Sequence, residues 1–128
     1  GIFYNQIVSG DVINDKNREI ISLDKSGNLF IISNKGEVIN QLKIKDTDEK
    51  ETKVTLFDVN KDKKDEIIIY GGSNNIYCYN GKLELLPGFP VKGSFKPDFT
   101  DFNSDGLYEM VVSSFDKNIY VYTIPIEK

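Results

Sequence analysis

The sequence predicts an all-β fold made of three consecutive repeats. An Asp-rich segment occurs three times, and at the same spacing each copy is followed by two short runs rich in β-branched and aromatic residues. No stretch has the sustained 3.6-residue period of an amphipathic helix. With 39% hydrophobic and 12% aromatic residues in a chain of 128, a packed core is expected.

The three repeats align without a gap when an aspartate is taken as the first position of each. These aspartates are Asp11, Asp58 and Asp101. A glutamate stands eight residues after each one, and an asparagine seventeen residues after it; they are Glu19, Glu66 and Glu109, and Asn28, Asn75 and Asn118. The first positions lie 47 and 43 residues apart, close to the period of about 40–50 residues that propeller blades have.

Short β-branched and aromatic runs, bounded by Asp, Asn, Gly and Lys, predict the strands of each repeat. In the first repeat they span roughly 3–9, 19–24, 28–33 and 37–44. In the second they span roughly 53–58, 66–71, 75–80 and 82–86, and in the third roughly 95–101, 108–114 and 118–124. The charged segment 43–53 has no apolar face and is interpreted as a connector.

The second strand of the repeats is apolar on both faces, at 66–70 and again at 109–112. An antiparallel sheet with one wet face would alternate, and a parallel sheet would need helical crossovers. Face-to-face stacking of antiparallel sheets around an axis fits both observations. We therefore expect three four-stranded antiparallel β-propeller blades, at about 1–46, 47–92 and 93–128, with the last blade incomplete. A β-sandwich is the alternative.

Three blades are fewer than the 4–8 that close a propeller. In the third repeat, Pro125 follows soon after the last predicted strand and cannot donate to a sheet ladder. The terminal blades should each expose an apolar face, which invites association. We expect either a part of a larger propeller or subunits that join blade to blade, with two chains in a six-bladed ring as the simplest closure.

The Asp-rich segment of the third repeat has the composition of a calcium-binding turn. Oxygen side chains occupy its positions 1, 3, 5 and 9, and position 6 is a glycine. The predicted ligands are Asp101, Asn103, Asp105 and Glu109, with the backbone carbonyl of Leu107. Hard oxygen ligands of this number and charge suit Ca²⁺. An EF-hand is excluded because position 12 is Val112 instead of a glutamate.

The other two repeats depart from this pattern. The second keeps its oxygen ligands but has Lys63 in place of the glycine; its predicted set is Asp58, Asn60, Asp62 and Glu66, with the carbonyl of Lys64. The first has Ile13 at a ligand position. We therefore rank the third repeat first as a calcium site, the second repeat next and the first repeat last. The alternative is a metal-free turn closed by Asx-type hydrogen bonds.

Glu19 persists in the first repeat although Ile13 removes a metal ligand there. This predicts that the glutamate serves the fold without metal, by accepting backbone N–H bonds that close the turn.

Cys78 aligns with Ile31 and Val121 and is predicted to be a core residue. Two aromatic pairs are expected to pack between blades, with ligand stacking as the alternative; they are Tyr77 with Tyr79 and Tyr120 with Tyr122.

These turns, each followed by an apolar and then an aromatic strand, resemble FG-GAP/VCBS repeats, the blades of integrin-α-like propellers. The segment 86–91 also resembles the connector between blades in microbial members of that family. The resemblance covers nearly the whole chain. It implies seven- or eight-bladed closed propellers, Ca²⁺ in the turns, an extracellular or cell-surface location, and adhesion or scaffolding roles.

Composition excludes several function classes. A net charge of −4, with only a short lysine cluster at 61–64, argues against nucleic-acid binding. No apolar run approaches the ~18–20 residues of a membrane span. There is no histidine, and the single cysteine allows no intrachain disulfide.

The sequence therefore predicts a module that binds a protein or a carbohydrate and is not itself an enzyme. The best candidate surface is 86–95, where Phe89 either faces outward or plugs the junction between blades. The alternative function is the propeller portion of a carbohydrate-active enzyme, a polysaccharide lyase or hydrolase.

Overall fold

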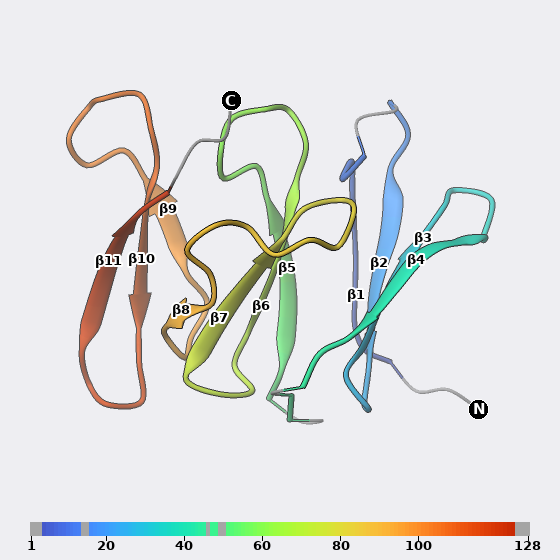
Figure 1. The fold of residues 1–128 in the computed structure, drawn as a ribbon, viewed down its shortest axis with the longest axis horizontal. Coiled ribbons are helices and arrows are strands. Elements are labelled where there is room, and N and C mark those ends of the chain that lie inside the picture. The colour runs from blue at the N-terminus through green and yellow to red at the C-terminus, as the bar shows by residue number, and fades with distance from the viewer. Residues whose placement is uncertain (1–3, 14–15, 46, 49–50, 125–128) are drawn as a thin grey trace.

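The structure, a computed structural model, describes residues 4–13, 16–45, 47–48 and 51–124. Within these ranges the chain forms eleven strands and no helix. The strands make three antiparallel sheets, which pack face to face in a row (Figure 1). The all-β, antiparallel prediction is confirmed. In the described part of the chain, no helix is long and apolar enough to cross a membrane.

The first sheet, sheet 1, has four strands in chain order. They are β1 (Tyr4–Gly10), β2 (Glu19–Asp24), β3 (Asn28–Ile32) and β4 (Val38–Lys43). The tight turn between β2 and β3 is held by Asp24, whose Oδ1 accepts the N–H groups of Ser26 and Asn28, both at 2.9 Å. These strands agree with the predicted ones to within a residue or so at each end.

The second sheet, sheet 2, also has four strands, but the fourth is not the predicted one. The strands are β5 (Lys53–Phe57), β6 (Glu66–Tyr70), β7 (Asn75–Tyr79) and β8 (Val91–Lys92). The prediction of a strand at 82–86 is wrong. Asn80 Oδ1 accepts the N–H groups of Lys82 and Glu84, which folds the chain into an Asx-type turn. Leu85 forms an isolated bridge to Tyr79, and the fourth strand is β8, which pairs with Asn75 and Ile76 of β7.

The third sheet, sheet 3, has three strands in the order β11-β10-β9. They are β9 (Asp98–Thr100), β10 (Glu109–Ser113) and β11 (Ile119–Thr123). The first strand is much shorter than the predicted 95–101. Up to residue 124, where the described part ends, β11 has no fourth strand beside it. Pro125 and the three residues after it lie outside the described residues.

The core consists of two apolar layers, one on each face of sheet 2. Ile67 and Ile69 pack against sheet 1, whereas Ile68 and Cys78 pack against sheet 3. This confirms that the second strand of the middle repeat is buried on both faces. The prediction that Cys78 is a core residue is confirmed as well, and burial raises the pKa of its thiol.

The aromatic side chains predicted to pack between repeats do so. Tyr77 and Tyr79 stack with their ring centroids 6.3 Å apart and belong to the layer between sheets 1 and 2. Tyr120 and Tyr122 stack at 6.1 Å and contact the layer between sheets 2 and 3. Phe89 is half-buried against that second layer, so it plugs the junction and does not face outward.

Both terminal sheets expose apolar side chains on the face that points away from sheet 2. On sheet 3, Ile119 is 73% exposed and Val121 is 59% exposed. On sheet 1, Ile7 is 63% exposed and Val38 is 56% exposed. The expectation that each terminal repeat exposes an apolar face is confirmed.

Equivalent positions of the second and third repeats should differ sharply in their contribution to stability. Ile76 is fully buried between sheets, and Ile119 occupies the same repeat position on the exposed face of sheet 3. We expect Ile76→Ala to lower the free energy of unfolding by about 2–5 kcal/mol. Ile119→Ala should change it by less than about 0.5 kcal/mol. Urea denaturation of dilute, monomeric protein measures both, and equal losses would contradict this description of the core.

Candidate metal centre

The three Asp-rich turns lie at the same end of the sheets, at the top of Figure 1. Hydrogen bonds link neighbouring turns. The N–H of Asp65 donates to the carbonyl of Asp11 at 2.8 Å, and Lys61 Nζ donates to the carbonyl of Gly106 at 2.6 Å. Lys61 Nζ also lies 4.6 Å from the centre of the Tyr108 ring, a cation–π distance. The turns therefore form one continuous row.

Each turn is closed by its glutamate in the same way. The glutamate at position 9 starts the second strand, is buried, and accepts the N–H of the residue at position 2 through Oε1. The bonds are Val12 to Glu19 at 2.9 Å, Val59 to Glu66 at 2.9 Å, and Phe102 to Glu109 at 3.0 Å. The predicted hydrogen bond is confirmed in all three repeats, including the first, where Ile13 replaces a ligand.

The aspartates at position 1 order the second and third turns through matching bonds. Asp58 accepts the N–H groups of Asp62 and Lys63 at 3.1 and 2.8 Å. Asp101 accepts those of Asp105 and Gly106, also at 3.1 and 2.8 Å. Although burial acts to raise the pKa of Asp101, these N–H bonds outweigh it and lower the pKa. The carboxylate is therefore held in its charged form.

The predicted carboxylates converge in both of these turns. Asp58, Asp62 and Glu66 form one group, and Asp101, Asp105 and Glu109 form another. In each group the ligand oxygens lie within 4.8 Å of one another. Since Ca²⁺–oxygen distances are about 2.3–2.6 Å, two oxygens on opposite sides of one ion stand about 5 Å apart. The spacing fits the coordination shell of a single cation.

The asparagine at position 3 lies inside each group. One of the two terminal atoms of the Asn60 side-chain amide is 3.0 Å from Asp62 Oδ1 and 3.2 Å from Asp58 Oδ1. With its nitrogen on that side, the amide donates to both carboxylates. With its oxygen there, three oxygens would lie together, an arrangement that a bound cation would stabilise. Asn103 Oδ1 accepts the N–H of Asp105 at 3.2 Å, so its amide also lies within the third turn.

The residues at position 7 were predicted to supply carbonyl oxygens. In the structure their N–H groups donate hydrogen bonds to the aspartate at position 5 of the same turn. The N–H of Lys64 donates to Asp62 Oδ1, and that of Leu107 donates to Asp105 Oδ1, both at 2.9 Å. The side chain of Lys64 also forms an ion pair with Asp62 at 3.9 Å. This ammonium group competes with a cation for the second turn.

Position 6 requires a left-handed backbone in both turns. Gly106 has φ +87°, and Lys63 has φ +71°. A residue with a side chain pays about 1–2 kcal/mol for this conformation, whereas glycine adopts it without steric cost. The third turn is therefore the less strained of the two.

One oxygen of the third turn has no partner. Glu109 Oε2 is buried and makes no hydrogen bond within the described residues, although Oε1 of the same carboxylate does. A buried, unsatisfied carboxylate oxygen costs roughly 1–3 kcal/mol or more. It lies in the same group as Asp101 and Asp105, so a cation there would satisfy it.

The glutamate of the second turn has a strongly shifted ionisation. Burial raises the pKa of Glu66 to about 8, and the charges of Asp62, Asp58 and Asp65 add to the shift. The hydrogen bond from Val59 acts in the opposite direction and is outweighed. Near neutral pH this carboxyl group therefore holds a proton in the absence of a cation.

The first turn gathers no comparable group among its described residues. Ile13 stands at the third position, and its N–H makes a second, longer bond of 3.4 Å to Glu19. Asn14 and Asp15 lie outside the described residues.

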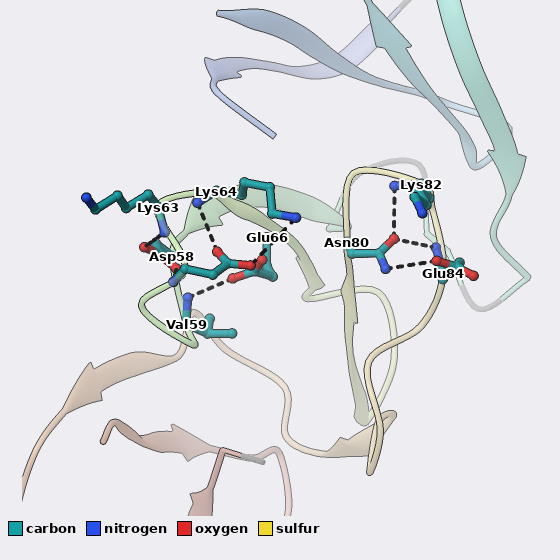
Figure 2. A network of polar contacts seen from close by, with 9 residues as sticks. Asp58, Val59, Lys63, Lys64, Glu66, Asn80, Lys82 and Glu84 are labelled. Atoms are coloured by element: carbon teal, nitrogen blue, oxygen red, sulfur yellow. Dashed lines mark hydrogen bonds and ion pairs between the residues drawn. The ribbon is translucent and has the colours of Figure 1, made fainter. Parts of the chain in front are cut away.

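A cleft of about 470 Å³ lies beside the second turn, and sequence reasoning did not foresee it. Two of its walls are the second Asp-rich turn and the Asn80–Glu84 turn, which face one another in Figure 2. Val12 and Ile13 of the first turn also line it. Asp62, Lys64, Lys82 and Glu84 give it charges of both signs. The Asn80-Gly81 pair was a turn signal that could have indicated the second wall, but the predicted strand at 82–86 obscured it.

No protein-family model matches the chain, and no curated protein matches its sequence.

The bond between glutamate and turn should stabilise the first repeat in the absence of metal. We expect Glu19→Ala to lower the free energy of unfolding by about 1.5–3 kcal/mol, the usual range for a hydrogen bond to a charged group. The loss should be the same in calcium and in chelator. Glu37→Ala, at an exposed position in the turn between β3 and β4, is the control and should cost less than about 0.5 kcal/mol. An unchanged melting temperature for Glu19→Ala would contradict a stabilising role for this hydrogen bond.

The Glu66 pKa predicts a pH dependence of stability in chelator. The folded-state pKa of about 8 lies above the ordinary value of 4.5, so folding favours the protonated form. The stability that this proton contributes is complete below about pH 4.5 and is lost as the pH rises through about 8. The wild type should therefore lose stability relative to Glu66→Gln over this range. Denaturant unfolding of both proteins at several pH values measures the difference, and parallel profiles would rule the shift out.

Proposed function

We propose that this chain is a non-catalytic binding and scaffolding module, built as β-propeller blades, whose second and third Asp-rich turns hold Ca²⁺. The observation that carries this proposal is the repetition of one turn geometry. The same acidic triad, with hydrogen bonds of matching length, occurs at the same end of sheets 2 and 3. A structure that repeats with this regularity serves a common structural purpose.

Calcium is the cation that this donor set favours. The side chains offer only oxygen atoms, from carboxylates and one amide per turn, and there is no histidine in the sequence to attract a transition metal. Bound calcium would satisfy Glu109 Oε2 and displace the proton from Glu66. The third turn should bind more tightly than the second because it has Gly106 and lacks the lysine that pairs with Asp62. We propose no site in the first turn.

The proposal of propeller blades is supported by the way the sheets pack. Sheets 1, 2 and 3 lie face to face in chain order, and each of the two layers between them is apolar (Figure 1). Together with the turns, this supports the resemblance to FG-GAP/VCBS repeats. The roles implied by that family are adhesion or scaffolding at an extracellular or cell-surface location.

A binding role is supported by what the polar groups already do. The glutamates close the turns, the aspartates order them, and the single thiol is buried. The polar cleft beside the second turn offers amide, carboxylate and ammonium groups, which suit a protein or a carbohydrate ligand equally.

Calorimetric titration with CaCl₂ tests the metal sites. For the wild type we expect weak binding, with Kd of about 10⁻⁴–10⁻³ M as in other extracellular modules. Asp105→Ala should abolish the tighter site, and Asp62→Ala with Asp105→Ala should abolish both. Calcium should also raise the melting temperature of the wild type relative to chelator.

The control is Asp116→Ala, which removes a carboxylate in the β10–β11 turn, outside both triads. It should bind calcium as the wild type does. Flat titrations for the wild type, with the same melting temperature in calcium and in chelator, would show that the turns are metal-free Asx caps.

A further inference from the structure

The three sheets present equivalent residues on the face that points toward the C-terminal side of the repeat array. Positions 11, 19 and 21 of each repeat lie on this face. In sheets 1 and 2 they are at most 1% exposed because the next sheet covers them: Ile21, Leu29 and Ile31, then Ile68, Ile76 and Cys78. In sheet 3 they are Val111, Ile119 and Val121, and the last two are 73% and 59% exposed. We call these three residues the leading face.

The opposite face of each sheet also repeats. Ile67 and Val54 of sheet 2 are buried against sheet 1. Their equivalents in sheet 1 are Ile20 and Ile7, which are 38% and 63% exposed. Val38 of β4, which pairs with Ile32 of β3, is also exposed. We call Ile7, Ile20 and Val38 the trailing face.

The chain itself shows how two such faces pair. The side of sheet 1 that is equivalent to the leading face packs on the side of sheet 2 that is equivalent to the trailing face. Sheet 2 packs on sheet 3 in the same way. Two faces of the same type never meet among the described residues. From this repeated contact we infer that the leading face of one molecule docks on the trailing face of a second copy of this chain, head to tail.

The chemistry of the two faces favours association. Each carries β-branched aliphatic side chains, and together these resemble the layers already buried inside the molecule. Removing such surface from water is favourable in proportion to the apolar area covered. Because the contact joins two different faces, it leaves one of each type free until a ring closes. The contact does not depend on bound calcium, so it can fail or hold independently of the proposed function.

Light scattering coupled to size exclusion tests the contact with the 128-residue chain, in calcium and in chelator. We expect a mass above the 14.5 kDa of one chain, increasing with concentration. Val121→Asp in the leading face and Ile7→Asp in the trailing face should each give a monomer. Both positions are more than half exposed, so the fold should survive, and circular dichroism checks this. Ile119→Asp is a second variant of the leading face.

A mixture of the two variants identifies the orientation. Val121→Asp keeps an intact trailing face and Ile7→Asp an intact leading face, so the equimolar mixture should form a dimer of twice the single-chain mass. Leu85→Asp, an exposed apolar position on neither face, should associate as the wild type does.

Three outcomes would overturn the inference. A wild type that stays monomeric at high micromolar concentration would show that something other than a second copy covers these faces. Association that persists in either single variant would indicate contact between like faces. A mixture that remains monomeric would exclude the head-to-tail pairing.

Discussion

Every sheet of this protein has two apolar faces, and this requirement for a neighbour on each side shapes the whole molecule. Sheet 2 satisfies it completely, with Ile67 and Ile69 covered on one side and Ile68 and Cys78 on the other. Sheets 1 and 3 satisfy it on one side only. The same burial that holds the three sheets together therefore leaves an unsatisfied surface at each end.

The turns are held by hydrogen bonds in addition to this burial, in which Val12 and Val59 take part. Each buried glutamate accepts the N–H of the residue at position 2 and closes the turn from within the protein. The first turn shows that this bond forms where the metal pattern is broken at Ile13. A cation in the other turns would therefore meet carboxylates that are already in place, and its binding energy would go largely into coordination rather than folding.

Where sequence reasoning succeeded, the deciding interaction was local. The β-branched run at 66–70 and the aromatic run at 75–79 form strands close to where they were expected. The fourth strand of sheet 2 was misplaced because the choice was not local. The run at 82–86 begins in an Asx turn at Asn80 and keeps a single bridge to β7, between Leu85 and Tyr79. The strand β8, which follows a further loop, pairs with the other end of β7. Phe89 was ambiguous for the same reason, since its position depends on two sheets at once.

The sequence by itself determined the repeat register, most of the strands, and the oxygen side chains that converge in two turns. These depend on spacing and alternation along the chain, which residue identity controls directly. Only the tertiary structure decided that Lys61 reaches across to the Gly106 carbonyl, that Glu66 is buried deeply enough to hold a proton, and that Ile119 lies in solvent while its equivalent Ile76 is buried. Those properties arise from which sheet lies beside which, and a residue's own identity does not specify its neighbour.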